Sequence, residues 1–73
     1  MIRPIAAGLA VLAAINRDGP ISMMGIARAA EVPYPTACRI VQTLQHEGLI
    51  EKEPARKRYR VTSLVKTLST GFQ

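Results

Sequence analysis

The chain has 73 residues, with ten Lys or Arg against five Asp or Glu, so its formal net charge is +5. This length allows one domain with a small core, and the excess of basic residues favours an anionic partner such as nucleic acid. A single cysteine excludes an internal disulfide, and one cysteine with one histidine cannot supply the usual zinc ligands. Without paired carboxylates, an activated nucleophile or a phosphate loop, neither an enzyme nor a cofactor is expected, and the expected location is cytoplasmic.

The first predicted helix runs from Pro4 to Arg17 and ends at the stop signal Asp18-Gly19-Pro20. One stripe of large apolar side chains is expected to face the core. The opposite side has no charged residue, which favours packing against a helix of a partner subunit or another domain. An alanine-rich helix with high propensity is the alternative. The large stripe contains Ile2, Ile5, Leu9 and Leu12, and opposite it lie Ala7, Ala10 and Ala14 with Val11 and Ile15 beside them.

A positive charge followed by this short apolar run also resembles a secretory signal, although the run is too short to span a bilayer. The regular stripe and a proline at the first helical turn favour a folded helix instead. We therefore expect the segment to belong to the domain.

Two short helices joined by a tight turn follow. Ser22 is a natural N-cap for a helix that reaches Ala30, and prolines at positions 33 and 35 interrupt the pattern. A further helix is predicted from Pro35 to Glu47, with Gly48 as its left-handed C-cap. Its outer face carries no acidic side chain before Glu47. The predicted core residues are Met23, Ile26, Ala27 and Ala30 on the first of these helices, and Ala37, Ile40, Val41 and Leu44 on the second.

A basic β-hairpin and the start of a last helix complete the chain. The segments 49–53 and 58–61 alternate in hydropathy and are joined by Pro54-Ala55-Arg56-Lys57, which predicts an antiparallel pair. Ser63 is the predicted N-cap of the last helix, with Leu64, Val65 and Leu68 apolar. The end at Gly71-Phe72-Gln73 suggests a cut from a longer protein.

These elements predict a mainly α fold with a small β-hairpin, a winged helix-turn-helix in which residues 1–62 form the DNA-binding domain and residues 63–73 start a linker helix. Helix 35–47 fits the major groove, and the basic wing at 54–60 fits phosphates or the minor groove. A winged helix that binds protein is the alternative. RNA binding is disfavoured, because three aromatic residues form no stacking platform.

Two side chains on the third helix are the strongest candidates for reading bases. Arg39 can donate twice to guanine O6 and N7 or neutralise a phosphate, and Gln42 can pair with adenine. Thr36 fits a DNA contact and support of the helix start equally well. Tyr34 fits a phosphate ligand and a packed turn residue equally well, whereas the wing cations suit phosphates. The predicted DNA-binding residues are Ser22, Tyr34, Pro35, Thr36, Arg39, Gln42, Thr43, Arg56, Lys57, Arg58 and Arg60.

The chain resembles the N-terminal domain of the IclR family of bacterial transcriptional regulators. The resemblance implies base-reading roles for Thr36 and Arg39. It also implies a homodimer or dimer of dimers through helix 4–17 and the linker helix, and a small-molecule effector bound by an absent C-terminal domain. The resemblance to activators of aromatic-acid breakdown is confined to Ile2–Ile5 and Leu68–Phe72. The family match rests on segments 5–12, 26–28, 32–33, 36–44, 47–51 and 59–62.

Several residues depart from the pattern of that family. Glu31 stands where the turn usually has glycine, so the turn must change its angles or tolerate strain. Tyr34 and Pro35 replace a Lys-Ser pair, and Gly25 replaces a capping Glu. The wing lacks its usual glycine and is one residue longer. These differences affect the expected operator contacts more than the expected fold.

Overall fold

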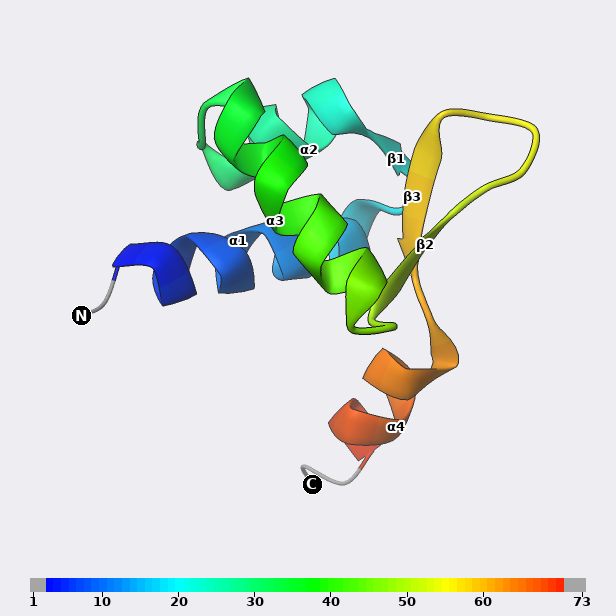
Figure 1. Ribbon diagram of the computed structural model, residues 1–73. Helices are drawn as coiled ribbons and strands as arrows, with labels where there is room; N and C mark the ends of the chain where they lie inside the picture. Colours follow the sequence, from blue (N-terminus) through cyan, green and yellow to red (C-terminus); the bar gives the residue numbers. More distant parts are fainter. Residues whose placement is uncertain (1–2, 71–73) are drawn as a thin grey trace.

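A computed structural model describes residues 3–70, within which the chain forms four helices around a small antiparallel sheet (Figure 1). This arrangement confirms the predicted fold class. The N-terminal Ile2 and the end at 71–73 lie outside the described residues, as does the side chain of Leu68. The elements in chain order are α1 (Arg3–Asp18), β1 (Ile21–Ser22), α2 (Met23–Ala30), α3 (Tyr34–His46), β2 (Ile50–Lys52), β3 (Arg58–Val61) and α4 (Ser63–Thr70).

The sheet has the strand order β1-β3-β2, and both strand pairs are antiparallel. The predicted hairpin is therefore confirmed as β2 and β3, whereas β1 was not predicted. In the register of the pairs, Tyr59 lies opposite both Ile21 and Lys52. Because directly opposed residues share a face of the sheet, these three side chains lie on the same side, which is the side of the core.

The core forms where α1, α2 and α3 meet the sheet. Its largest fully buried side chains are Val11, Ile15, Ile26 and Val41. The predicted apolar faces of α2 and α3 are confirmed, because each contributes two buried residues and two that are partly buried against the core. Burial of these faces fixes which side of α3 points outward.

The predicted orientation of α1 is wrong. Ile5 and Leu9, which were expected to face the core, are 59% and 62% exposed. The helix instead buries Val11, Ala14 and Ile15, the side that was expected to contact a partner. Leu12 is partly buried against the core, as predicted. The error has a simple physical reason: both sides of α1 are apolar, so the helical period alone does not distinguish them.

Helix α2 begins and ends as its cap residues dictate. The Ser22 hydroxyl oxygen accepts a hydrogen bond from the Gly25 N–H over 3.1 Å, which confirms the predicted N-cap. Glu31 ends the helix in the left-handed region, with φ 56° and ψ 46°. Glu31 thus adopts the conformation that glycine would otherwise supply, and the turn keeps its shape at the cost of backbone strain.

Replacing Glu31 with glycine is expected to stabilise the domain by about 0.5–1 kcal/mol, because glycine adopts positive φ without a Cβ clash. The gain is limited by the larger entropy of glycine in the unfolded chain. Urea unfolding followed by circular dichroism measures the change. Glu31→Ala is the control, since alanine keeps the strain, and equal stabilisation by both variants would contradict the explanation.

The two ends of α3 and the start of α4 lie within one residue of their predicted positions, and α4 includes Ser63, which was predicted as its N-cap. Gly48 follows α3 with φ 80°, which confirms the left-handed position. Helix α4 begins at Ser63, buries Val65 and leaves Leu64 45% exposed. Within residues 3–70, every helix is too short or too polar to cross a membrane.

Candidate nucleic-acid interface

The outer face of α3 is exposed to solvent along its whole length. Pro35, Arg39, Gln42 and His46 are all exposed, while the opposite face closes the core. Arg39 makes no ion pair with any residue in the described part of the chain. The face therefore presents a cation and an amide with their donors available, which is what base-edge or phosphate recognition requires.

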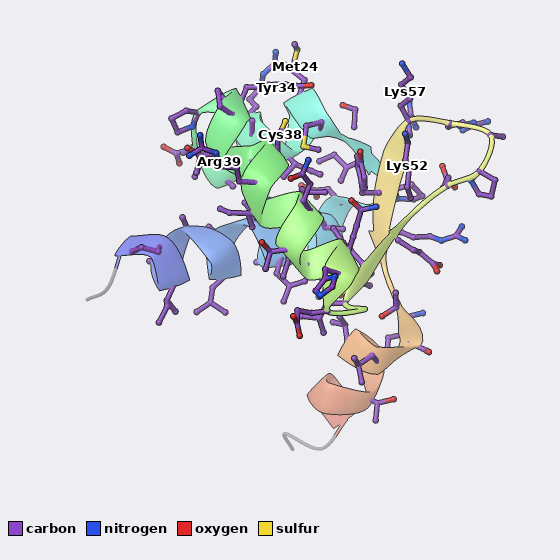
Figure 2. The ribbon with its side chains drawn as sticks, viewed as in Figure 1. Met24, Tyr34, Cys38, Arg39, Lys52 and Lys57 are labelled. Carbon is purple, nitrogen blue, oxygen red and sulfur yellow. The ribbon has the colours of Figure 1, made fainter. Side chains whose placement is uncertain are left out.

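The two flanks of α3 face different parts of the molecule. Arg39 and Thr43 lie toward the N-terminal half of α1, where they line a shallow hollow with Gly8. Cys38 lies on the flank that faces the hairpin, and Figure 2 shows Arg39 on the opposite flank. The Thr43 hydroxyl donates to the Arg39 backbone carbonyl over 3.1 Å. Only the lone pairs of that hydroxyl remain for another partner.

The start of α3 offers a second kind of donor. Pro33 occupies the N-cap position and no side chain caps the first turn, so N–H groups of that turn lack a side-chain partner. Tyr34 is 50% exposed beside them, and Thr36 is half-buried. An uncapped helix start with a positive dipole end is suited to a phosphate.

A cavity of about 490 Å³ separates α3 from the hairpin and the start of α2. We call it the α3–wing groove. Its lining includes two lysines and no acidic side chain. Figure 2 shows Lys52 and Lys57 on the hairpin, across from Cys38 on α3. The residues that line the groove include Ser22 just before α2, Met24 in α2, Cys38 and Gln42 on α3, and Lys52 and Lys57 on the hairpin.

The wing cations are not equivalent. Tyr59 and Val61 of β3 point toward the core, so Arg58 and Arg60 lie on the opposite, exposed face of the sheet. Arg60 Nε donates to Glu51 Oε2 over 2.8 Å, and its Nη1 lies 3.6 Å from Glu53 Oε2. The hydrogen bond and charge of Glu51 raise the pKa of Arg60. Arg60 is therefore already paired.

The remaining wing cations keep their charge unneutralised. Arg56, Lys57 and Arg58 form no ion pair with the residues that the structure describes. All three are exposed, on the loop after β2 and at the start of β3. Ser22 lies at the foot of α2, opposite Arg58 in the sheet. The fold thus gathers most of the predicted DNA-binding residues around α3 and the wing.

Lys52 is the residue that sequence reasoning missed. It lies opposite Tyr59 on the inner side of the hairpin and lines the α3–wing groove. The alternation of β2 carried the signal, because Ile50 and Lys52 share a face and Ile50 is 2% exposed. A lysine two residues after a core residue must project from the same side of the sheet, beyond the edge of the core.

Comparison with known proteins identifies the family. The model of the MarR family matches residues 9–60, which is most of the chain, and the protein belongs to the MarR family. The geometry agrees with this assignment, since the matched region contains the helix-turn-helix unit and the wing up to Arg60.

Solved structures share the fold. A protein of unknown function from Listeria innocua is 29% identical, with a TM-score of 0.80 over 94% of this chain. An IclR family transcriptional regulator from Brucella abortus is 22% identical, with a TM-score of 0.87 over 99% of this chain. An O-methyltransferase from neocarzinostatin biosynthesis is 23% identical, with a TM-score of 0.65 over 90% of this chain.

This chain spans only part of each of these proteins. It covers 55% of the Listeria chain, 28% of the Brucella regulator and 22% of the O-methyltransferase. A winged helix therefore occurs in proteins with different overall activities, and the two neighbours below 25% identity establish the fold alone.

Proposed function

We propose that this domain binds double-stranded DNA with sequence preference and serves a bacterial transcriptional regulator. Helix α3 enters the major groove, and the wing at 54–60 contacts phosphates or the minor groove. The observation that carries the proposal is the exposed, acid-free face of α3 with Arg39, beside a wing with Arg56, Lys57 and Arg58. None of these four cations forms an ion pair with a residue that the structure describes. Membership of the MarR family supports the same function.

We further propose that the parent protein is built like an IclR regulator. Residues 1–62 then form the DNA-binding domain, and residues 63–73 begin a linker helix toward an effector-binding domain. Support comes from the Brucella regulator, which matches 99% of this chain with 28% of its own length. It also comes from α4, which starts at Ser63 and exposes Leu64. Such a regulator acts in the cytoplasm, where its operator lies.

Replacing Arg39 with alanine is expected to remove most of the sequence preference. A bidentate contact between arginine and guanine contributes about 1–3 kcal/mol of discrimination, so the ratio of specific to non-specific affinity should fall roughly 5- to 150-fold. Duplexes selected from a random library supply the specific site, and fluorescence anisotropy measures both affinities.

Arg17→Ala is the matched control for that experiment. Arg17 is also an exposed arginine on a helix, but it pairs with Asp18 over 3.0 Å at the end of α1, and it is not among the residues that line the α3–wing groove. Its removal should leave the ratio unchanged. An unaltered preference in Arg39→Ala would refute the base-reading role while leaving DNA binding itself intact.

We propose that two copies associate through α1 and α4. The apolar residues available for such a contact are Ile5 and Leu9 on α1 and Leu64 on α4, all exposed in the isolated domain.

Serine at both Ile5 and Leu9 is expected to convert a dimer into a monomer. Both side chains are exposed, so the substitutions should leave the fold intact. Sedimentation velocity measures the mass, and circular dichroism checks the fold. Serine at Met24, which is equally exposed but lies on α2, is the control. A dimer that survives the double substitution contradicts the proposed contact.

A protein-interaction module is the second candidate. It is favoured by the same exposed apolar stripe on α1 and by the winged helix that an O-methyltransferase contains. A module of this kind would dimerise as described but show no DNA affinity at low salt. The anisotropy measurement separates the two functions.

A further inference from the structure

We propose that the α3–wing groove seats the sugar–phosphate backbone of one DNA strand, with Lys52 and Lys57 as its phosphate ligands. This inference rests on the proposed DNA binding and adds a residue, Lys52, to the interface. It also places the DNA strand on the inner side of the wing, whereas Arg58 and Arg60 lie on the outer side.

The charge of the lining residues indicates which kind of ligand the groove binds. Two lysines line it, and none of its lining residues is acidic. Both lysines lack an ion-pair partner within residues 3–70. The acids of the hairpin are directed elsewhere, because Glu51 and Glu53 contact Arg60. A groove with one positive wall and no acidic side chain in its lining attracts an anion.

The sheet holds Lys52 in place. It is the last residue of β2 and is paired with Tyr59 of β3, whose neighbour on the far side is Ile21 of β1. The aromatic ring of Tyr59 also lines the groove. The ammonium group of Lys52 is therefore presented from a paired strand, while the Lys57 ammonium comes from the loop at the tip of the same hairpin. Both sites lie along one wall.

Neutral donors line the opposite wall. Gln42 and Gln45 of α3 carry amides that hydrogen-bond phosphates or sugars without adding charge. The hydroxyl oxygen of Ser22 accepts from Gly25, so its own hydrogen remains free to donate. A long anionic chain with regularly spaced oxygens matches two walls of this kind better than a small anion does, because the donors are spread over three elements.

The first test uses Cys38 as a reporter. Cys38 is the only cysteine of the chain and lies in the groove, so alkylation by iodoacetamide reports on this position alone. Saturating random-sequence duplex at low salt is expected to slow alkylation at least tenfold, with anisotropy confirming binding in the same sample. An unchanged rate in DNA-bound protein would overturn the groove assignment and leave the proposed function standing.

The second test distinguishes a direct phosphate contact of Lys52 from the general effect of net charge on binding. Lys52→Gln should make the slope of log affinity against log salt shallower by about 1 on two unrelated duplexes, since one phosphate contact is lost. Lys66→Gln removes the same charge from α4, outside the groove, and should leave the slope unchanged. Equal effects of both variants would overturn the assignment.

Two further outcomes also decide whether the α3–wing groove binds a DNA strand. Absence of DNA binding by the unsubstituted chain at low salt rejects the proposed function, and the groove assignment with it. Protection of Cys38 by inorganic pyrophosphate but not by bound duplex would assign the groove to a small anion and overturn the proposal.

Discussion

Removing two wing cations by Lys57→Ala together with Arg58→Ala is expected to weaken binding to every DNA duplex alike, by roughly 10- to 100-fold at about 0.1 M salt. Neither side chain forms an ion pair within the described residues, so both charges are available to phosphates. Each lost contact should reduce the slope of log affinity against log salt by about 0.9. The slope of the double variant should therefore be shallower by about 1.8, with the sequence preference retained.

Arg17→Ala together with Lys66→Ala is the matched control for the wing variant. This pair lowers the net charge from +5 to +3, as the wing pair does, but its residues lie on α1 and α4. If the charges act only through long-range attraction, both double variants should lose the same DNA affinity, and that result would count against a wing contact. A slope changed only in the wing variant supports direct phosphate contacts.

Gly19→Ala is expected to destabilise the domain by about 2–3 kcal/mol, the upper part of the range for overpacking. A Cβ at this position would lie 2.5 Å from the Ile15 carbonyl oxygen and 3.1 Å from the Tyr59 carbonyl oxygen. Both are backbone atoms, so they cannot move aside without displacing α1 from β3. A domain of this size has a stability of roughly 5–10 kcal/mol, and a large share would be lost.

Gly8→Ala, inside α1, provides the opposite expectation. Gly8 has open space where a Cβ would lie, and alanine is favoured over glycine inside a helix by about 0.8–1.0 kcal/mol. Urea unfolding should therefore show a gain for Gly8→Ala and a loss for Gly19→Ala. A similar, small effect of both substitutions would show that the α1–β3 contact tolerates an added methyl group.

The sequence was sufficient to predict the helix-turn-helix unit and the hairpin. Ser22, the prolines at 33 and 35 and Gly48 act through local backbone chemistry, and the structure has each of their predicted effects. The outer face of α3 followed from the same information, because its inner face is apolar at a clear helical period.

The orientation of α1 could not be predicted in the same way. Ile5 and Leu9 on one side and Val11 and Ile15 on the other are all apolar. Which side is buried depends on the shape of the space that α2, α3 and β3 leave for the helix. That information is tertiary and is not carried by the helical period.

The arrangement of the candidate site could be predicted only in part, for a related reason. Residues on α3 and at the wing tip are recognisable by type, but pairing between strands decides which cations are free. The contact of Arg60 with Glu51 and the position of Lys52 opposite Tyr59 both depend on the register of β2 and β3. Strand β1 has two residues, too few to show any alternation.

Strand β1 connects the helix-turn-helix unit to the wing. Ser22 pairs with Arg58 of β3, and the hydroxyl of the same residue caps α2, which begins at the next residue. On the proposed DNA contacts, a domain braced in this way has a fixed span between α3 and the wing, so a duplex whose curvature or groove width differs must bend or twist to fit. The energy of that distortion depends on the stiffness of individual base steps. Affinity should therefore vary with bases that no side chain touches.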